Sequence, residues 1–263
     1  MKIQVLVITM NNNFEVIEKM NISSDVVIAN QGSENSVIFN DGSTKKLMVT
    51  TSTIGTSRNR NIALAHAFQE DELVLFSDDD LIFNYDYKET ILNEFANHPE
   101  AEAIKFNLHD ISSFRKITMK KIDKFKKATR RNMGSSGVCG LAIKQSVLNR
   151  INIRFNEEFG PGTLNYCGED TIFIQEMINK KVRLFLSPYD IAGIDQTKSL
   201  WFKGYEEKYF FVMGKVLAVC YPKMCRLLAL RSAIRFSRRK KCNFSFFQLV
   251  SIFNKGINSM KQV

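Results

Sequence analysis

The chain has 263 residues, of which 44% are hydrophobic and 24% are charged. This balance is typical of a folded globular protein, and the 4 prolines and 13 glycines exclude collagen-like chains and disordered chains rich in these residues. A chain of this length buries most of the surface of its unfolded form, so it needs neither a metal nor a disulfide to fold. We expect one large domain, or one domain with a small appendage.

Charge is distributed unevenly along the chain, whose formal net charge is +10. Residues 1–110 carry a net charge of −9, whereas residues 111–263 carry +19. A basic half favours a polyanionic partner, such as a diphosphate, an anionic lipid surface or a nucleic acid.

The cysteines and histidines show no metal-binding pattern. The five cysteines form no CxxC pair and the three histidines have no matching spacing, so we expect reduced, buried thiols in a cytosol. The first ten residues read as a β-strand rather than as a signal peptide, and no run of 18 apolar residues occurs. We therefore expect a cytoplasmic protein with no membrane-spanning helix.

Short apolar strands alternate with helices in the first hundred residues. The predicted buried strands are Ile3–Thr9, Asp25–Ala29 and Leu73–Phe76. The predicted helices are 14–20, 58–68 with Ser57 as its N-cap, and 89–97. This alternation predicts a doubly wound, mostly parallel α/β sheet, in which ligands bind beyond the carboxyl ends of the strands.

The second half continues this pattern and ends in a basic tail. Residues 115–131 hold nine Lys and Arg, which predicts an exposed loop or helix beside a site. Further predicted elements are strands at 138–143 and 182–186, a loop at 155–168, and helices at 145–150, 169–179 and 206–221. We expect an α/β domain at 1–221 and a basic amphipathic helical segment at 222–263.

Three consecutive carboxylates, Asp78, Asp79 and Asp80, directly follow the strand Leu73–Phe76. Like charges this close repel one another, which favours a neutralising cation. Carboxylate oxygens suit Mg²⁺ or Mn²⁺, and these ions commonly join one or two carboxylates to substrate phosphates. The alternative is a solvated acidic turn, which the position after a buried strand disfavours.

Two further polar clusters open predicted helices. Ser57-Arg58-Asn59 can attract phosphate, or it can be a capped surface helix with a salt bridge. Gly168-Glu169-Asp170 follows a loop rich in Gly and Pro. A carboxylate there can act as a general base if it reaches an attacking hydroxyl, or it can simply complement the helix dipole.

These clusters, together and in this order, resemble the family-2-like glycosyltransferases of the GT-A fold. The matching stretches cover most of residues 3–188: VLVIT, DVVIANQGS, SRNRNIALAHA, LVLFSDDD, FNEEFGPGTLNYCGEDTIFIQEM and RLFLSP. The segment SLWFKGYEEKYFFVMGKVLA further resembles bacterial capsule and surface-polysaccharide transferases of this group. The resemblance implies metal-dependent, inverting transfer of a sugar from a nucleotide-sugar, with UDP favoured, to a hydroxyl of a glycan or lipid-linked acceptor.

The resemblance also implies roles for individual residues. Asp78 and Asp80 match the outer positions of the DxD motif, so Asp80 would hold Mn²⁺ or Mg²⁺ and Asp78 would contact the ribose or the ion through water. Asp170 matches the catalytic base, and Glu169 matches the acid that orients the acceptor. Arg58 matches the arginine near the nucleotide.

The sequence departs from the family pattern at two places. Many relatives have Asp-Asp-Gly-Ser after the second strand, where this chain has Asn30-Gln31-Gly32-Ser33. Amides can also pair with a pyrimidine edge, so we expect Asn30 and Gln31, together with Asp79, in the nucleotide site. Many relatives place a His after the last strand, where this chain has Asp195. Asp195 could supply the metal ligand in its place, or the metal could lack that ligand.

The tail from Pro222 carries ten Lys and Arg and no acid. Residues 222–241 place apolar side chains on one helical side and arginines on another, and residues 243–260 add several phenylalanines. This pattern is typical of a helix on an anionic membrane surface. The alternative is a helical pair packed on the first domain with a solvated basic face.

Two other functions fit parts of this pattern. A nucleotidyltransferase would need a Gly-rich, Arg-containing phosphate loop after the first strand, where Thr9–Asn13 has no glycine. A non-catalytic nucleic-acid-binding protein would use the basic half, but the sequence has neither an RNA-recognition nor a helix-turn-helix signature, so we expect no nucleic acid. An inactive transferase-like chain is disfavoured by the intact DxD and GED clusters, and the oligomeric state stays open.

Overall fold

The computed structural model describes residues 1–111, 121–130, 132–133, 137–195, 204–240 and 242–260. The described strands are β1 (Ile3–Met10), β2 (Asp25–Gln31), β3 (Ser36–Asp41), β4 (Lys45–Thr51), β5 (Leu73–Asp78), β6 (Leu81–Phe83), β7 (Ala103–Asp110), β8 (Lys126–Lys127), β9 (Leu141–Lys144) and β10 (Leu184–Ile194). The described helices are α1 (Glu15–Lys19), α2 (Thr56–Ala65), α3 (Tyr87–Asn97), α4 (Gln145–Ile151), α5 (Glu169–Asn179), α6 (Glu207–Cys220), α7 (Cys225–Ser237) and α8 (Phe246–Ser259).

The described strands form one sheet in the order β3-β4-β2-β1-β5-β9-β7-β10-β6, with β8 paired to β10. Strands β4, β2, β1 and β5 are parallel, as are β7 and β10, and β9 is antiparallel to both β5 and β7. The carboxyl ends of all six parallel strands therefore lie at one edge of the sheet. This is the mixed, mostly parallel α/β architecture that the sequence predicts, and it confirms the fold class.

Both faces of the sheet are covered by helices. Leu73 and Leu75 of β5 pack on the side of α1 and α3, while Val74 and Phe76 pack on the side of α2, α4 and α5. Successive side chains of a strand point to opposite faces, so a strand covered on both sides reads as an unbroken apolar run. This is why β1, β2 and β5 are predictable from sequence.

Other parts of the sheet were not predicted. The edge strand β3 is exposed along its whole length, and Val37, Ile38 and Phe39 are 66%, 50% and 53% exposed. Strand β7 carries the polar residues Lys105 and Asn107 at buried positions, which interrupts its apolar pattern. The apolar residues of β3 therefore do not indicate a buried face, and the polar residues of β7 break the apolar run that marks a buried strand.

Several predicted boundaries are wrong. The strand expected at 138–143 begins at Leu141, and the one expected at 182–186 begins at Leu184 and continues to Ile194. Ser57 is not an N-cap, because Gly55 occupies that position with no side-chain capping bond. The predicted basic element at 115–131 lies partly outside the described residues.

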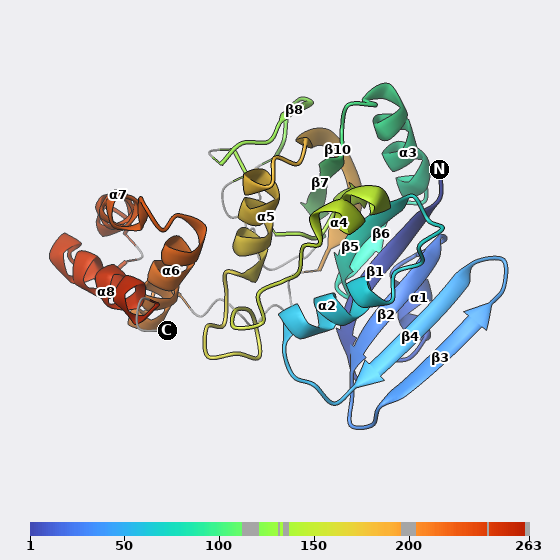
Figure 1. Cartoon of the computed structure of the whole chain (residues 1–263), viewed down its shortest axis with the longest axis horizontal. Coiled ribbons are helices and arrows are strands. Elements are labelled where there is room, and N and C mark those ends of the chain that lie inside the picture. The colour runs from blue at the N-terminus through green and yellow to red at the C-terminus, as the bar shows by residue number, and fades with distance from the viewer. Residues whose placement is uncertain (112–120, 131, 134–136, 196–203, 241, 261–263) are drawn as a thin grey trace.

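A bundle of three helices stands at the end of the molecule opposite β3 and β4 (Figure 1). Helices α6, α7 and α8 share an aromatic and aliphatic core that includes Phe210 and Phe253. The other side of α6 packs through Val212 and Val216 on Phe159 and Ile172 of the α/β unit. The domain division after residue 221, which stays a prediction, falls between α6 and α7.

Helices α6 and α8 approach each other closely at two glycines. A Cβ atom on Gly256 would lie 2.0 Å from the backbone oxygen of Phe211, and one on Gly214 would lie 2.3 Å from that of Phe253. Both obstacles are backbone atoms, so a side chain could fit only if the helices moved apart.

We expect Gly256→Ala to lower the free energy of unfolding by about 1–3 kcal/mol, the usual range for overpacking a well-packed contact. Gly42→Ala is the matched control, because a Cβ there meets its nearest neighbour at 3.6 Å. Urea unfolding measures both variants. Equal stability of the two variants would contradict the close helix contact.

Candidate active site

Acidic side chains gather at the carboxyl edge of the sheet. Strand β5 ends at Asp78, and the chain turns through Asp79 and Asp80 into β6. Because β6 pairs with the end of β10, the backbone N–H of Asp195 donates to the carbonyl oxygen of Asp80 at 3.0 Å. The structure thus brings the predicted residues Asp78, Asp80 and Asp195 to the same place.

A buried arginine, Arg60 of α2, joins this edge to the start of α5. Its side chain is 4% exposed, and its Nη2 lies 2.9 Å from Asp78 Oδ1. Its Nη1 donates to Asp170 and lies 3.7 Å from Glu169 Oε1. One guanidinium therefore faces the strand-end acid and both predicted acids of the GED cluster.

Helix α2 positions Arg60 beside the acids because the helix face that packs on the protein is polar. Ser57, Arg60 and Asn61, at spacings of three and four residues, are all 6% exposed or less. Ser57 Oγ donates to the Phe159 carbonyl at 2.6 Å, and Asn61 Nδ2 donates to the Phe155 carbonyl at 2.9 Å. Since buried polar groups require partners, these bonds fix the loop at 155–168 that leads into Glu169 and Asp170.

The two acids of α5 lie in the first turn of that helix. Asp170 Oδ2 accepts a hydrogen bond from the Val138 backbone N–H at 3.1 Å. Burial raises the pKa of Asp170, and the charge of Arg60 partly opposes this shift. Burial, together with the Asp170 charge, raises the pKa of Glu169 to about 8. A carboxylate whose pKa is raised accepts a proton more readily near neutral pH.

The guanidinium keeps its charge in this environment. Burial tends to lower the pKa of Arg60, but the carboxylates of Asp170 and Asp78 outweigh burial and raise it above its ordinary value. A second buried cation is nearby, since Lys105 of β7 donates from Nζ to the Cys139 carbonyl and interacts electrostatically with Asp170 and Asp78. Burial lowers the pKa of Lys105.

Asp80 has the properties of a cation ligand. Burial raises its pKa to about 7, and the charges of Asp78 and Asp79 add to the shift. Its Oδ1 atom is buried and has no hydrogen-bond partner among the described residues. A buried carboxylate oxygen without a partner is costly, and a divalent ion would compensate it. This oxygen of Asp80 fits one ligand position of Mg²⁺ or Mn²⁺.

The described residues contain no group of three or more His, Cys, Asp or Glu side chains that could hold a metal ion. The metal site expected at Asp78, Asp80 and Asp195 thus stays a prediction.

Asn30 and Gln31 end β2, and in the structure both contact protein groups. The amide of Asn30 donates to the Asn12 carbonyl at 3.1 Å and accepts from the Asn12 N–H at 3.2 Å, so it holds the segment after β1. Gln31 Oε1 accepts from the Gly55 N–H at 3.3 Å, at the start of α2. Both side chains are at the edge where the nucleotide is expected, and they also order that edge.

Asp79 and Arg58 differ in their surroundings. Asp79 Oδ2 accepts from Thr9 Oγ1 and, at 3.2 Å, from Asn12 Nδ2, so it ties β5 to the end of β1. Arg58 is 51% exposed and its Nε lies 3.4 Å from Glu157 Oε2. The arginine held among the acids is Arg60, which the sequence analysis did not select.

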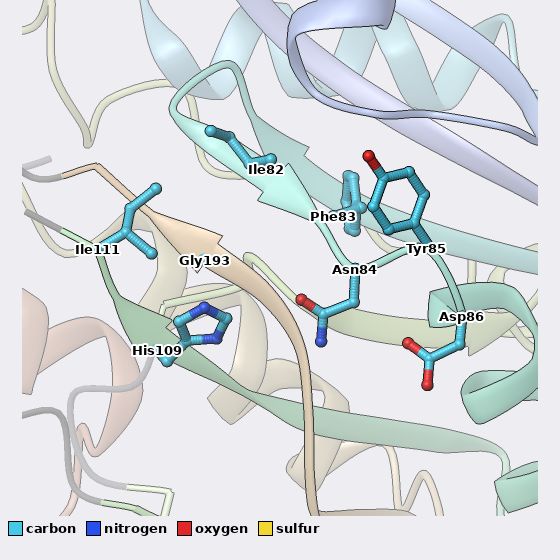
Figure 2. A pocket seen from close by; sticks show the side chains of 8 residues that line it. All are labelled: Ile82, Phe83, Asn84, Tyr85, Asp86, His109, Ile111 and Gly193. Carbon is cyan, nitrogen blue, oxygen red and sulfur yellow. The ribbon is translucent and has the colours of Figure 1, made fainter.

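A pocket of about 470 Å³ lies beside this edge (Figure 2). Its lining is mostly apolar and comes from β6, the segment after it, and the ends of β7 and β10: Ile82, Phe83, Asn84, Tyr85, Asp86, His109, Ile111 and Gly193. A Cβ on Gly193 would lie 2.5 Å from Ile111 Cγ2, so only glycine lets the Ile111 side chain pack this closely on β10. The pocket adjoins the acidic cluster through β6, which begins one residue after Asp80.

Structures of S. aureus TarS share this fold. The structure of TarS 1–349 in complex with UDP-GlcNAc has a TM-score of 0.66 and 14% identity, and covers 100% of this chain and 92% of that chain. The complex of TarS 1–349 with UDP has a TM-score of 0.62 and 15% identity over the same shares. Another TarS structure has a TM-score of 0.61 and 17% identity, and this chain spans 44% of it.

No family model and no curated protein sequence matches the chain. At these identities the structural similarity shows the fold, and it agrees with the GT-A-like fold that the sequence resemblance implied.

We expect Arg60→Gln to lower the free energy of unfolding by about 3–5 kcal/mol, because it leaves the half-buried carboxylates of Asp78 and Asp170 without their partner. Arg58→Gln, the exposed neighbour, should change stability by less than about 1 kcal/mol. Adding Asp170→Asn to Arg60→Gln should recover part of the loss, since it removes one unpaired charge. Urea unfolding of the wild type and the three variants measures these effects. Equal losses for Arg58→Gln and Arg60→Gln would refute a stabilising role of the ion pairs that Arg60 makes with the acids.

Proposed function

We propose that the chain is a metal-dependent, inverting glycosyltransferase that moves a sugar from a UDP-sugar to a hydroxyl of a glycan or lipid-linked acceptor in surface-polysaccharide synthesis. The main support is the set of ion pairs made by Arg60, which holds Asp78 at the end of β5 beside Glu169 and Asp170 of α5. The shared fold with a UDP-GlcNAc complex of TarS adds support for a nucleotide-sugar donor.

The donor end of the site would be the edge formed by β1, β2 and β5. Breaking the bond between the sugar C1 and the diphosphate oxygen builds negative charge on the diphosphate and positive charge on the sugar ring. Asp80, with Asp78 and Asp195, would hold Mn²⁺ or Mg²⁺, which when bound supplies Lewis-acid stabilisation of the leaving diphosphate. Asn30 and Gln31 would face the nucleobase of the donor, because they end β2 at the same edge of the sheet.

The acceptor end would be the start of α5. Asp170 would take the proton from the attacking hydroxyl, and its carboxylate accepts hydrogen bonds from Arg60 and the Val138 N–H. Glu169 would orient the acceptor. A single base on the face opposite the leaving group gives one displacement and inversion at the anomeric carbon, and such a base contributes about 10²–10⁴-fold to the rate.

Replacing Asp170, the proposed catalytic base, should lower the turnover without changing the affinity for UDP. We expect Asp170→Asn to lower UDP release from UDP-GlcNAc by about 10²–10⁴-fold in the presence of Mn²⁺, with the affinity for UDP unchanged within about threefold. Glu89→Gln is a matched control, since Glu89 also lies in the first turn of a helix, α3, and is exposed. Turnover of Asp170→Asn close to that of the wild type would exclude Asp170 as the base.

The metal requirement can be tested by thermal unfolding. We expect Mn²⁺ to increase the rise in Tm that UDP produces, because a ligand that binds only the folded state stabilises it by mass action. Asp80→Asn should abolish this Mn²⁺-dependent part.

Asp71→Asn is the control for that experiment, because Asp71 is a buried carboxyl before β5, at the opposite end of the same strand. A Tm response to Mn²⁺ that survives in Asp80→Asn would place the ion elsewhere. Repeating the measurement with GDP and TDP identifies the nucleotide.

A further inference from the structure

Helix α7 packs into the bundle through three small side chains and the partly buried Phe236, and it presents aliphatic side chains to the outside. Its inner face is Cys225, Ala229 and Ala233, which are 4% exposed or less. Its outer face carries Leu227, Leu230 and Ile234, which are 61%, 41% and 40% exposed. These three large apolar residues face solvent, whereas an amphipathic helix of a globular protein normally turns such residues toward the core.

The exposed aliphatic residues form one row. Spacings of three and four residues place Leu227, Leu230 and Ile234 along a single line of the helix surface. Met224, just before the helix, is 50% exposed, and Phe247, in the first turn of α8, is 81% exposed. A row of exposed aliphatic side chains along one helix face marks an interaction surface.

Exposed arginines flank the row. Helical spacing places Arg226 on one side and Arg231 and Arg235 on the other, with Arg238 just after the last turn. The whole segment 222–263 has ten Lys and Arg and no acid. A second copy of this surface would therefore be repelled, whereas a partner that is negatively charged outside and apolar inside would match both features.

We infer that α7 is a docking surface for an anionic lipid bilayer. The helix lies in the plane of the membrane, with the row of Leu227, Leu230 and Ile234 in the boundary between headgroups and acyl chains. The arginines on either side pair with lipid phosphates, each contributing to the attraction to an anionic leaflet.

The dimensions agree with a helix that lies on the surface. Helix α7 has 13 residues and is about 20 Å long, less than the roughly 30 Å of a hydrocarbon core. Among the described helices, none has both the length and the apolar character needed to cross a bilayer. A soluble polyanion would also bind the arginines, but it would leave the aliphatic row in water.

Docking at α7 would also fix the position of the acidic site relative to the membrane. Helix α6 bridges the bundle and the site, and it packs so tightly on the start of α5 that a Cβ on Gly168 would lie 2.3 Å from Val216 Cγ2. If the proposed transfer is correct, docking brings the enzyme to the membrane that carries a lipid-linked acceptor. The docking itself does not depend on the transferase activity, so its failure would leave the proposed function intact.

Vesicle flotation of the full chain tests the inference. We expect binding to vesicles in which phosphatidylglycerol replaces about a third of the phosphatidylcholine, and little binding to phosphatidylcholine alone. Two variants remove the two halves of the surface: one replaces Leu227, Leu230 and Ile234 by Ser, and the other replaces Arg231, Arg235 and Arg238 by Gln. The serine variant should lose about tenfold or more in partition coefficient, and the glutamine variant on the order of 100-fold.

Each variant has a control of the same composition elsewhere. Val37, Ile38 and Phe39 of β3, replaced by Ser, match the aliphatic variant because they are similarly exposed. Lys2, Arg154 and Lys181, replaced by Gln, match the charge variant because they are exposed on the α/β unit. Both controls should float like the wild type, and circular dichroism with thermal unfolding should show that all variants are folded.

The possible results either support or overturn the inference. Absence of flotation of the wild type, or flotation of both α7 variants at the wild-type level, overturns it. Loss in the glutamine variant with full retention in the serine variant overturns insertion and identifies a general polyanion surface. Loss in both variants, with the controls unaffected, supports the bilayer.

Discussion

The site depends on one ion-pair cluster, in which the buried guanidinium of Arg60 lies between Asp78 at the end of β5 and Asp170 at the start of α5. Each carboxylate alone would be costly at these half-buried positions, and the pair would repel. The shared cation makes their proximity tolerable, but it does not neutralise all the acids nearby. The remaining negative charge around Asp80 is what a divalent ion would compensate.

The sequence predicted the parts of this arrangement that follow from regular patterns. Buried parallel strands gave unbroken apolar runs, and the acids after Leu73–Phe76 and after Gly168 stood at predictable ends. Arg60 was missed because Arg58 occupies the matching motif position. A signal was present in the spacing of Ser57, Arg60 and Asn61, which places three polar side chains on one helical face. Their burial, however, depends on the loop at 155–168, which is distant in sequence.

For the C-terminal tail, too, some features could be predicted from the sequence and others could not. Its basic and amphipathic character was evident from composition, and both a packed helical bundle and a membrane surface were compatible with it. The structure contains the bundle, since α6, α7 and α8 share a core. Which side of α7 faces inward could not be predicted from the sequence. A face with Ala229 and Ala233 can pack at a short distance between helices, and a face with leucines can pack at a longer one, so both faces are compatible with a buried position.

Strand β3 has a consequence for the behaviour of the chain in solution. It is the last strand of the sheet on its side, it is exposed along its full length, and it has no pairing partner beyond it among the described residues. Free backbone groups beside Val37, Ile38 and Phe39 form a template for adding another strand. Crowding of this chain therefore favours edge-to-edge aggregation, and charged substitutions at these three positions are the means to improve its solubility.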